Sequence, residues 1–223
     1  MPSLETLLEW SRTTPGLTPF LLDYHRLQVE HFIWQGVGGG INAPLGGINA
    51  PLDMRVLDIG VEYRKPYLRH LGANYITLNE DDPTAAEWAW KLPDMDKPDV
   101  LGDICALPFP DADFDFVLCT EVLEHIADPW LAVREIRRVL RPGGAALMTS
   151  PFMWPWHGST RYADFWRFTA DGWRQLCRDF AAVRVFPQEF HPDSPLPDLM
   201  AIEKMGVMGD VRMATGYAVR ATR

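Results

Sequence analysis

The chain has 223 residues, of which 47% are hydrophobic and 23% charged, and its formal net charge is -9 at pH 7. This length and composition fit one globular α/β domain with a substantial core. The negative charge, without a cluster of Lys or Arg, argues against a nucleic-acid partner, because such binding relies on cationic contacts to phosphates.

The sequence contains no pattern of a targeting or membrane segment. Its start, Met1 to Glu5, lacks a basic stretch followed by an apolar run, and no segment approaches the roughly 18 uninterrupted apolar residues of a membrane span. We therefore expect a cytoplasmic protein without a membrane span. The cysteines Cys105, Cys119 and Cys177 do not have the number or spacing of a disulfide framework or a four-cysteine zinc site. We expect reduced core cysteines and no metal ion.

The N-terminal part of the chain combines helical patterns with a repeat. Apolar spacing predicts two helices before residue 36, separated at Pro15-Gly16. The heptapeptide Gly-Gly-Ile-Asn-Ala-Pro-Leu then occurs twice in tandem over residues 39–52. Two copies are too few for a solenoid, so we interpret them as a flexible linker, with a lid over the site as the alternative. The expected division is an N-terminal part, 1–54, and a main domain, 55–223, within one globular unit.

From Arg55 onward, short apolar runs alternate with helical patterns, which is typical of β-α-β units around a mostly parallel sheet. One helix is predicted to begin near Pro66 and to end at Gly72, and another follows Pro83. The predicted strands cover residues 56–59, 75–78, 100–101, 114–120, 145–149, 182–186 and 217–221.

The clearest helix follows the N-cap Asp128 and is predicted to continue until Pro142-Gly143 ends it. A last helix covers residues 169–180, whose apolar side chains recur on one face. We make no prediction for residues 192–209.

Polar residues and a glycine follow four of the predicted strands. Gly60, Asn79, Asp103 and Glu121 each come at or just after a strand end. In a parallel sheet, ligands bind beyond the carboxyl ends of the strands, so these residues are expected to be neighbours. Gly60 permits close backbone approach to a ligand, because it has no Cβ.

The chain resembles the class I S-adenosylmethionine-dependent methyltransferases, in particular the type-11 family, over roughly residues 55–190. This family has a Rossmann-like α/β fold with a mostly parallel seven-stranded sheet flanked by helices. Four stretches carry the resemblance: Val56-Leu57-Asp58-Ile59-Gly60, Gly102-Asp103 with Ala106-Leu107-Pro108-Phe109, Phe114-Asp115 through Thr120-Glu121-Val122-Leu123-Glu124-His125, and Leu140-Arg141-Pro142-Gly143-Gly144.

The resemblance implies a set of cofactor-binding residues for S-adenosylmethionine. In that family the positions matching Asp58, Ile59 and Gly60 lie near the methionine part of the cofactor. The end of the second strand, here Asn79 and Glu80, binds the ribose. The remaining matched positions are Asp103 and Ile104, which are expected on the adenine, and Thr120 and Glu121, which are expected beneath the sulfonium.

The chain departs from the family pattern in two places. Glu62 and Arg64 stand where further glycines are usual after the first strand, and Asn79 stands where an acid is usual. These departures favour, as the alternative function, a repurposed fold that catalyses another reaction or acts as a noncatalytic partner. A nicotinamide dehydrogenase is disfavoured, because no Gly-x-Gly-x-x-Gly run follows the first strand.

A second set of residues suggests the acceptor chemistry. Ser150-Pro151-Phe152, His157 and the run from Asp164 to Thr169 resemble methyltransferases found beside sugar and polysaccharide biosynthesis enzymes. His157 is the candidate general base, since the ordinary pKa of histidine lies near neutrality, and Tyr162 and Asp164 are candidates to position it. His125 is expected to stabilise the turn before Asp128.

The sequence therefore predicts a methyltransferase that moves a methyl group from S-adenosylmethionine to the oxygen or nitrogen of a small-molecule acceptor. Several aromatic side chains near His157 are interpreted either as a platform for a sugar or planar acceptor, or as ordinary core: Trp154, Trp156, Phe165, Trp166 and Phe168.

Overall fold

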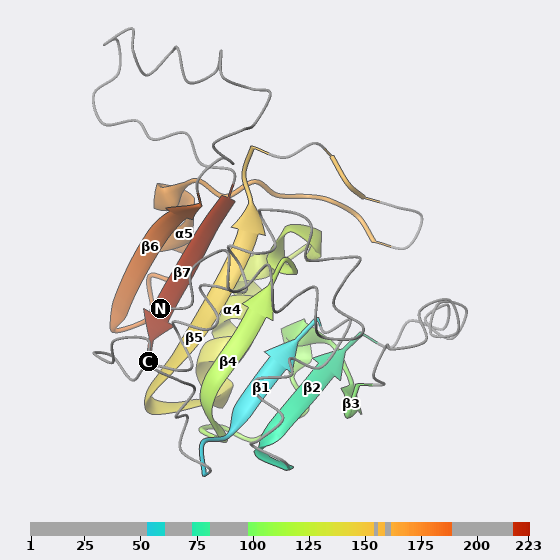
Figure 1. The fold of residues 1–223 in the computed structure, drawn as a ribbon, viewed down its shortest axis with the longest axis vertical. Coiled ribbons are helices and arrows are strands. Elements are labelled where there is room, and N and C mark those ends of the chain that lie inside the picture. Colours follow the sequence, from blue (N-terminus) through green and yellow to red (C-terminus); the bar gives the residue numbers. More distant parts are fainter. Residues whose placement is uncertain (1–52, 61–72, 81–97, 154–155, 159–161, 189–215) are drawn as a thin grey trace, which may run out of the picture.

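The computed structural model describes residues 53–60, 73–80, 98–153, 156–158, 162–188 and 216–223 (Figure 1). Several predicted features lie outside these ranges. They are the N-terminal helices, the tandem repeat, the helices expected after Pro66 and Pro83, and the segment 192–209.

Seven strands form one sheet in the order β3-β2-β1-β4-β5-β7-β6 (Figure 1). Their bounds are β1 Val56–Ile59, β2 Tyr75–Asn79, β3 Val100–Leu101, β4 Phe114–Thr120, β5 Leu140–Pro151, β6 Ala182–Gln188 and β7 Gly216–Thr222. The first five strands pair in parallel, whereas β7 is antiparallel to both of its neighbours. Strand order reverses between β1 and β4, which is where α/β sheets bind ligands.

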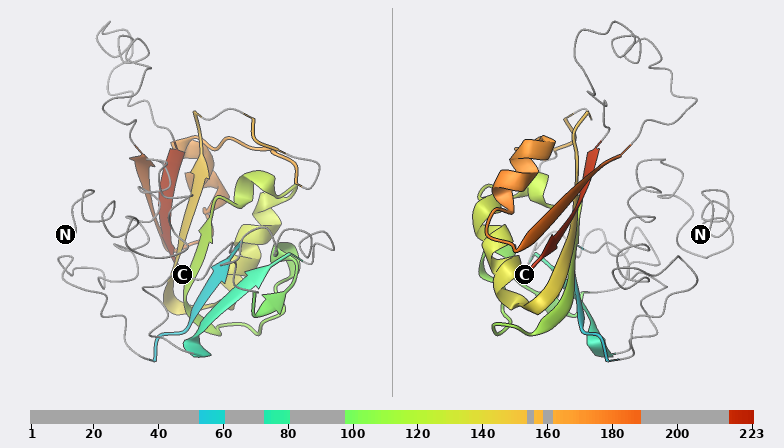
Figure 2. Two further views of the ribbon diagram at one scale, coloured as in Figure 1. Left: turned by 45° about the vertical axis from the view of Figure 1, so that its right-hand side comes forward. Right: turned by 90° about the vertical axis from the view of Figure 1, so that its left-hand side faces the viewer.

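Two α-helices cover one face of this sheet, α4 (Pro129–Val139) and α5 (Ala170–Leu176) (Figure 2). Asp128 caps α4, because its Oδ1 accepts from the backbone N–H of Leu131, and Thr169 caps α5 through Gly172. Two short 3-10 segments, η2 (Ile104–Ala106) and η3 (Leu123–His125), follow β3 and β4. None of the helices in the described ranges is long and apolar enough to cross a membrane.

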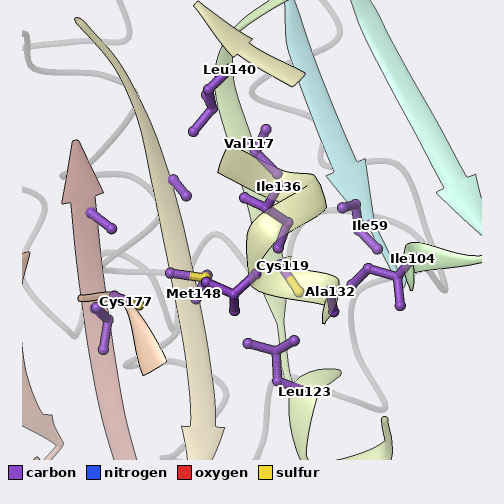
Figure 3. Close-up of a cluster of buried hydrophobic side chains, with 14 of the residues drawn as sticks. Ile59, Ile104, Val117, Cys119, Leu123, Ala132, Ile136, Leu140, Met148 and Cys177 are labelled. Atoms are coloured by element: carbon purple, nitrogen blue, oxygen red, sulfur yellow. The ribbon is translucent and has the colours of Figure 1, made fainter. Parts of the chain in front are cut away.

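The main core lies between α4 and the sheet (Figure 3). Ala132, Ile136 and Val139 recur at helical spacing on α4 and are buried against Val117 and Met148 of β4 and β5. All four residues of β1 are buried, as expected for a central parallel strand. The three cysteines were predicted as core residues: Cys119 and Cys177 are buried, whereas Cys105 is only partly buried.

Most predicted strands agree with the structure to within two residues, but the junction of α4 with β5 was predicted wrongly. The helix ends at Val139, and the strand already begins at Leu140 rather than at residue 145. Leu140 pairs with Phe114, and the register shifts at this point. A Cβ on Gly144 would lie 2.9 Å from the carbonyl oxygen of Asp115, so this glycine permits the close pairing of the strands. The helix predicted over 169–180 is also shorter, because α5 ends at Leu176.

Candidate functional site

The carboxyl ends of the central strands form one continuous edge. Backbone hydrogen bonds join them: Gly60 donates to Leu78 (2.9 Å), Gly102 donates to Asn79 (2.9 Å), and Glu121 donates to Thr149 (3.1 Å). Since each bond links the residues that end neighbouring strands, the edge runs from β3 through β2, β1 and β4 to β5. Gly60, Asn79, Asp103 and Glu121 therefore lie along one edge, as predicted.

At the end of β1, the structure assigns Gly60 a packing role. Its φ is +78°, and a Cβ placed on it would lie 2.2 Å from Cγ2 of Val122. The missing Cβ of Gly60 thus leaves room for the side chain of Val122. The sequence had instead led us to expect that it leaves room for a ligand. Asp58 is fully buried and accepts a 2.7 Å hydrogen bond from the Tyr75 hydroxyl, while Ile59 is part of the core.

The end of β2 presents an amide and a carboxylate. Oδ1 of Asn79 accepts a hydrogen bond from the backbone N–H of Glu80 (3.0 Å), and the Glu80 side chain is exposed. The Glu80 carboxylate is therefore accessible to a hydroxyl-bearing ligand, one residue after Asn79, which stands where the family usually has an acid.

The end of β3 presents a second exposed carboxylate. Asp103 is the N-cap of η2, because its Oδ1 accepts from the backbone N–H of Cys105 at 2.7 Å. The thiol of Cys105 also hydrogen-bonds to the Asp103 side chain. Because the residue is nevertheless exposed, these contacts leave its carboxylate accessible to a ligand. Ile104 is only 5% exposed and belongs to the core.

The end of β4 is held in an unusual backbone conformation. Glu121 has a φ of +55°, which non-glycine residues rarely adopt. Its Oε1 accepts a 2.6 Å hydrogen bond from the hydroxyl of Thr149 on β5, and the preceding residue, Thr120, is partly buried. Strained backbone of this kind persists only where the surroundings fix it, and it is concentrated at functional sites.

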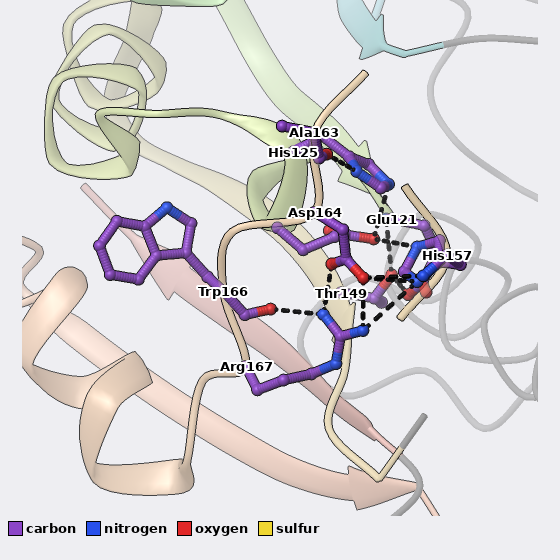
Figure 4. Close-up of polar contacts among 9 residues, drawn as sticks. Glu121, His125, Thr149, His157, Ala163, Asp164, Trp166 and Arg167 are labelled. Carbon is purple, nitrogen blue, oxygen red and sulfur yellow. Dashed lines mark hydrogen bonds and ion pairs between the residues drawn. The ribbon is translucent and has the colours of Figure 1, made fainter. Parts of the chain in front are cut away.

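A polar cluster lies beyond the ends of β4 and β5 (Figure 4). Asp164 is 1% exposed and accepts two hydrogen bonds from Arg167, at 2.5 Å and 2.7 Å, and one from the backbone N–H of His157 at 2.9 Å. Oδ2 of Asp164 lies 3.3 Å from Nδ1 of His157. Hydrogen bonding to Arg167 holds the pKa of Asp164 far below its ordinary value. The structure therefore brings His157 and Asp164 together.

His125 and Tyr162 join the same cluster. Nδ1 of His125 donates a 2.6 Å hydrogen bond to the carbonyl of Ala163, so the ring contacts this loop rather than the turn before Asp128, where it was expected. The ring also packs edge-on against Tyr162 and His157, with centroid distances of 4.6 Å and 4.8 Å. Burial lowers the pKa of His125 below its ordinary value.

Glu124 is the residue of this cluster that the sequence did not single out. Its side chain is 0% exposed, and its Oε1 lies 3.6 Å from Nε2 of His125 and 3.9 Å from Nε2 of His157. Burial, and then the nearby carboxylate of Glu121, raises the pKa of Glu124 well above its ordinary value. In the sequence, Glu124 follows Glu121 by three residues and directly precedes His125. This spacing alone does not distinguish a buried carboxylate from a solvated one.

The aromatic residues near this cluster divide between the two interpretations. Trp166 stacks with Phe168 and donates a hydrogen bond to the carbonyl of Ile126, so both rings pack within the fold. Trp156 and Phe165 are exposed. Trp154 lies outside the described residues. An acceptor platform would therefore rest on Trp156 and Phe165.

Comparison with known proteins finds similarity to methyltransferases over part of the chain. Residues 57–148 match a family described as "Methyltransferase domain". Over 97 residues the chain is 38% identical to the 27-O-demethylrifamycin SV methyltransferase of Amycolatopsis mediterranei, a match that covers 40% of this chain and 36% of that relative. The chain spans about a third or less of the length of the first curated relatives it matches.

Solved structures share the fold. A SAM dependent methyltransferase from Archaeoglobus fulgidus matches with a TM-score of 0.53 and 12% identity, over 90% of this chain and 95% of that chain. One from Mesorhizobium loti matches with a TM-score of 0.52 and 16% identity, over 89% of this chain and 98% of that chain. The strand order, the motifs and these matches lead to one conclusion: residues 57–148 are similar to the methyltransferase domain family, and the chain has the Rossmann-like α/β fold of these SAM dependent methyltransferases.

Proposed function

We propose that the protein transfers a methyl group from S-adenosylmethionine to an oxygen or nitrogen atom of a small-molecule acceptor. The observation that carries this proposal is the edge of the sheet. The accessible carboxylates of Glu80 and Asp103 follow β2 and β3 at this edge, and the histidine cluster follows β4 and β5 at the same edge. The name of the Amycolatopsis relative, which refers to 27-O-demethylrifamycin SV, supports a small-molecule acceptor.

The residues along this edge fit the cofactor. Asp103 offers a carboxylate oxygen for an exocyclic amine, and Glu80 with Asn79 offers acceptors for the ribose hydroxyls. The turn of Asp58, Ile59 and Gly60 would lie beside the methionine part, and Thr120 and Glu121 would lie beneath the sulfonium. When bound, S-adenosylmethionine supplies a methyl group that is already activated by a positively charged sulfur.

The protein's own contribution would be positioning and proton removal. A fixed in-line approach of the acceptor lowers the barrier by removing orientational freedom in advance. The acceptor's proton would leave at His157, whose Nδ1 faces Asp164 and whose Nε2 faces Glu124. Asp164 would position His157 by accepting a hydrogen bond from its backbone N–H. Tyr162 would position His125 by packing against its ring.

The substitution Asp103→Asn tests the adenine contact. The asparagine oxygen can still cap Cys105, so the fold should be retained, while the charge-assisted acceptor is lost. We expect the affinity for S-adenosylmethionine, measured by equilibrium dialysis, to fall by roughly tenfold or more. Asp171→Asn is the matched control, because Asp171 is an exposed residue on α5. Equal affinities for the two variants would remove Asp103 from the site.

A further inference from the structure

Glu124, His125 and His157 form a cluster of three donor groups that converge on one point. One atom from each, a carboxylate oxygen or a ring nitrogen, lies within 4.8 Å of the others. Two of the residues belong to η3 after β4, and the third follows β5, so the ends of two neighbouring strands bring the groups together.

The Nε2 atoms of both histidines lie on the side of Glu124. A carbonyl oxygen only accepts, so the bond to Ala163 requires a proton on Nδ1 of His125 and leaves the lone pair on Nε2. Nδ1 of His157 lies 3.3 Å from the carboxylate of Asp164 and 3.4 Å from Nη2 of Arg167. Asp164 favours a proton on this nitrogen, as a cation on Nε2 requires, whereas Arg167, which only donates, opposes it. Histidine ligands of metal ions are held in this way, with the second ring nitrogen on a carbonyl or a carboxylate.

Glu124 is the buried and unpartnered member of this cluster. Within the described part of the chain, both of its buried carboxylate oxygens lack a hydrogen-bond partner. The separations of 3.6 Å and 3.9 Å from the two Nε2 atoms are too long for hydrogen bonds. A buried acid with no hydrogen-bond partner is costly. It faces Nε2 of both histidines, and the lone pair on Nε2 of His125 attracts a cation as the carboxylate does.

We propose that Glu124, His125 and His157 bind one divalent transition-metal ion. Two imidazoles and one carboxylate suit Zn²⁺, Co²⁺ or Mn²⁺ better than Mg²⁺ or Ca²⁺, which prefer oxygen ligands. Bonds of about 2.1 Å place tetrahedral ligands roughly 3.4 Å apart, so the most widely separated atoms must approach by about 1.5 Å at most. The two histidine side chains are 17% and 30% exposed, which leaves the open coordination positions on the accessible side.

The site lies on the acceptor side, and its catalytic consequence rests on the proposed function. A hydroxyl of the acceptor placed on the cation loses its proton to solvent more readily. Its oxygen then forms the new bond to the methyl carbon as the bond between that carbon and sulfur breaks, and the electron pair of that bond stays on sulfur. With a metal ion bound, Nε2 of His157 is a ligand of that ion, and it no longer has the role of proton acceptor that the proposed function gives it without the metal.

The test is a titration of the full chain with Co²⁺ after dialysis against a chelator. We expect one Co²⁺ per chain, with visible absorption bands that Zn²⁺ abolishes by displacement. Glu124→Gln and His157→Gln should each weaken this binding by at least roughly tenfold, since changes to outer-shell groups alone cost about 10–100-fold. Glu124→Gln should remain folded, because it replaces an unpartnered buried acid with a neutral group of the same shape. Asp171→Asn again serves as the control.

Three outcomes would overturn the metal site: no binding of Co²⁺ or Zn²⁺, binding that is equally tight in both glutamine variants, or loss of binding in Asp171→Asn to the same extent. The affinity of the same samples for S-adenosylmethionine separates this inference from the proposed function. Cofactor binding without metal binding refutes the metal site alone, whereas metal binding without cofactor binding refutes the proposed function alone.

Discussion

Gly60 illustrates how one residue serves both backbone geometry and packing. Its φ of +78° lies in the left-handed region, and Val122 occupies the space where a Cβ would be. Val122 immediately follows Glu121, whose own φ is positive. The end of β1 and the end of β4 are therefore fitted to each other, and a change at Gly60 affects both.

We predict that Gly60→Ala destabilises the protein by about 3 kcal/mol, combining roughly 1 kcal/mol for the positive φ with about 2 kcal/mol of overpacking. Thermal unfolding should show a fall in Tm of roughly 10 °C. In a Val122→Ala background the same change should cost only about 1 kcal/mol, because the clash is removed. Gly172→Ala on α5 is the control, since its Cβ would meet atoms no closer than 3.4 Å. Equal costs in both backgrounds would contradict the packing role.

The site residues differ in how far sequence could predict them. Asp103 and Glu121 follow short apolar runs, and strand ends of a parallel sheet meet at one edge, so their neighbourhood was predictable. The role of Glu124 was not, because it depends on complete burial and on a contact with His157, 33 residues later in the chain. The partner of His125 was predicted wrongly for the same reason, since Ala163 lies on a distant loop.

At the scale of elements, α4 positions the candidate adenine site through Glu135. Its carboxylate accepts two 2.8 Å hydrogen bonds from Arg138 and a 3.0 Å bond from the backbone N–H of Leu107, just after η2. Arg138 in turn donates to the carbonyls of Leu107 and Phe109. Hydrogen bonding to Arg138 lowers the pKa of Glu135 below its ordinary value. The segment that carries Asp103 is thus tied to the helix.

We predict that Glu135→Gln lowers the free energy of unfolding by about 1–2 kcal/mol at pH 7, because charge-assisted hydrogen bonds are lost at a side chain that is 16% exposed. A carboxyl with a lowered pKa in the folded state stabilises the fold above the pKa of the unfolded chain, and this contribution is lost as the pH falls through the folded value. Urea denaturation should therefore show a difference between variant and wild type that shrinks below about pH 4. A difference that stays constant from pH 7 to pH 3 would exclude this role of the ion pair.

The elements themselves were largely predictable, because apolar periodicity and caps are local signals. The strand Val56–Ile59, the strand Phe114–Thr120 and the start of α4 at Pro129 agree with their predicted positions. The start of β5 was not predictable, since Pro142-Gly143 usually ends structure, and only the pairing of Leu140 with Phe114 makes this segment a strand.

In the whole molecule, the strand order brings the candidate site residues to one edge of the sheet. The reversal between β1 and β4 places the cofactor candidates on one part of the edge, while the histidine cluster follows β4 and β5. The two proposed functions, cofactor binding and acceptor activation, would therefore lie on adjacent parts of one sheet edge. The central claim is that this edge binds S-adenosylmethionine despite Glu62, Arg64 and Asn79.

The most direct test is calorimetric titration of the purified, ligand-free chain with S-adenosylmethionine and, separately, with S-adenosylhomocysteine. The account predicts one site per chain with micromolar affinity for both compounds, since they share the adenosine and the amino-acid part that the edge would hold. Folded, ligand-free protein that binds neither compound would contradict it, and would favour a methyltransferase fold repurposed for another reaction or for a noncatalytic role.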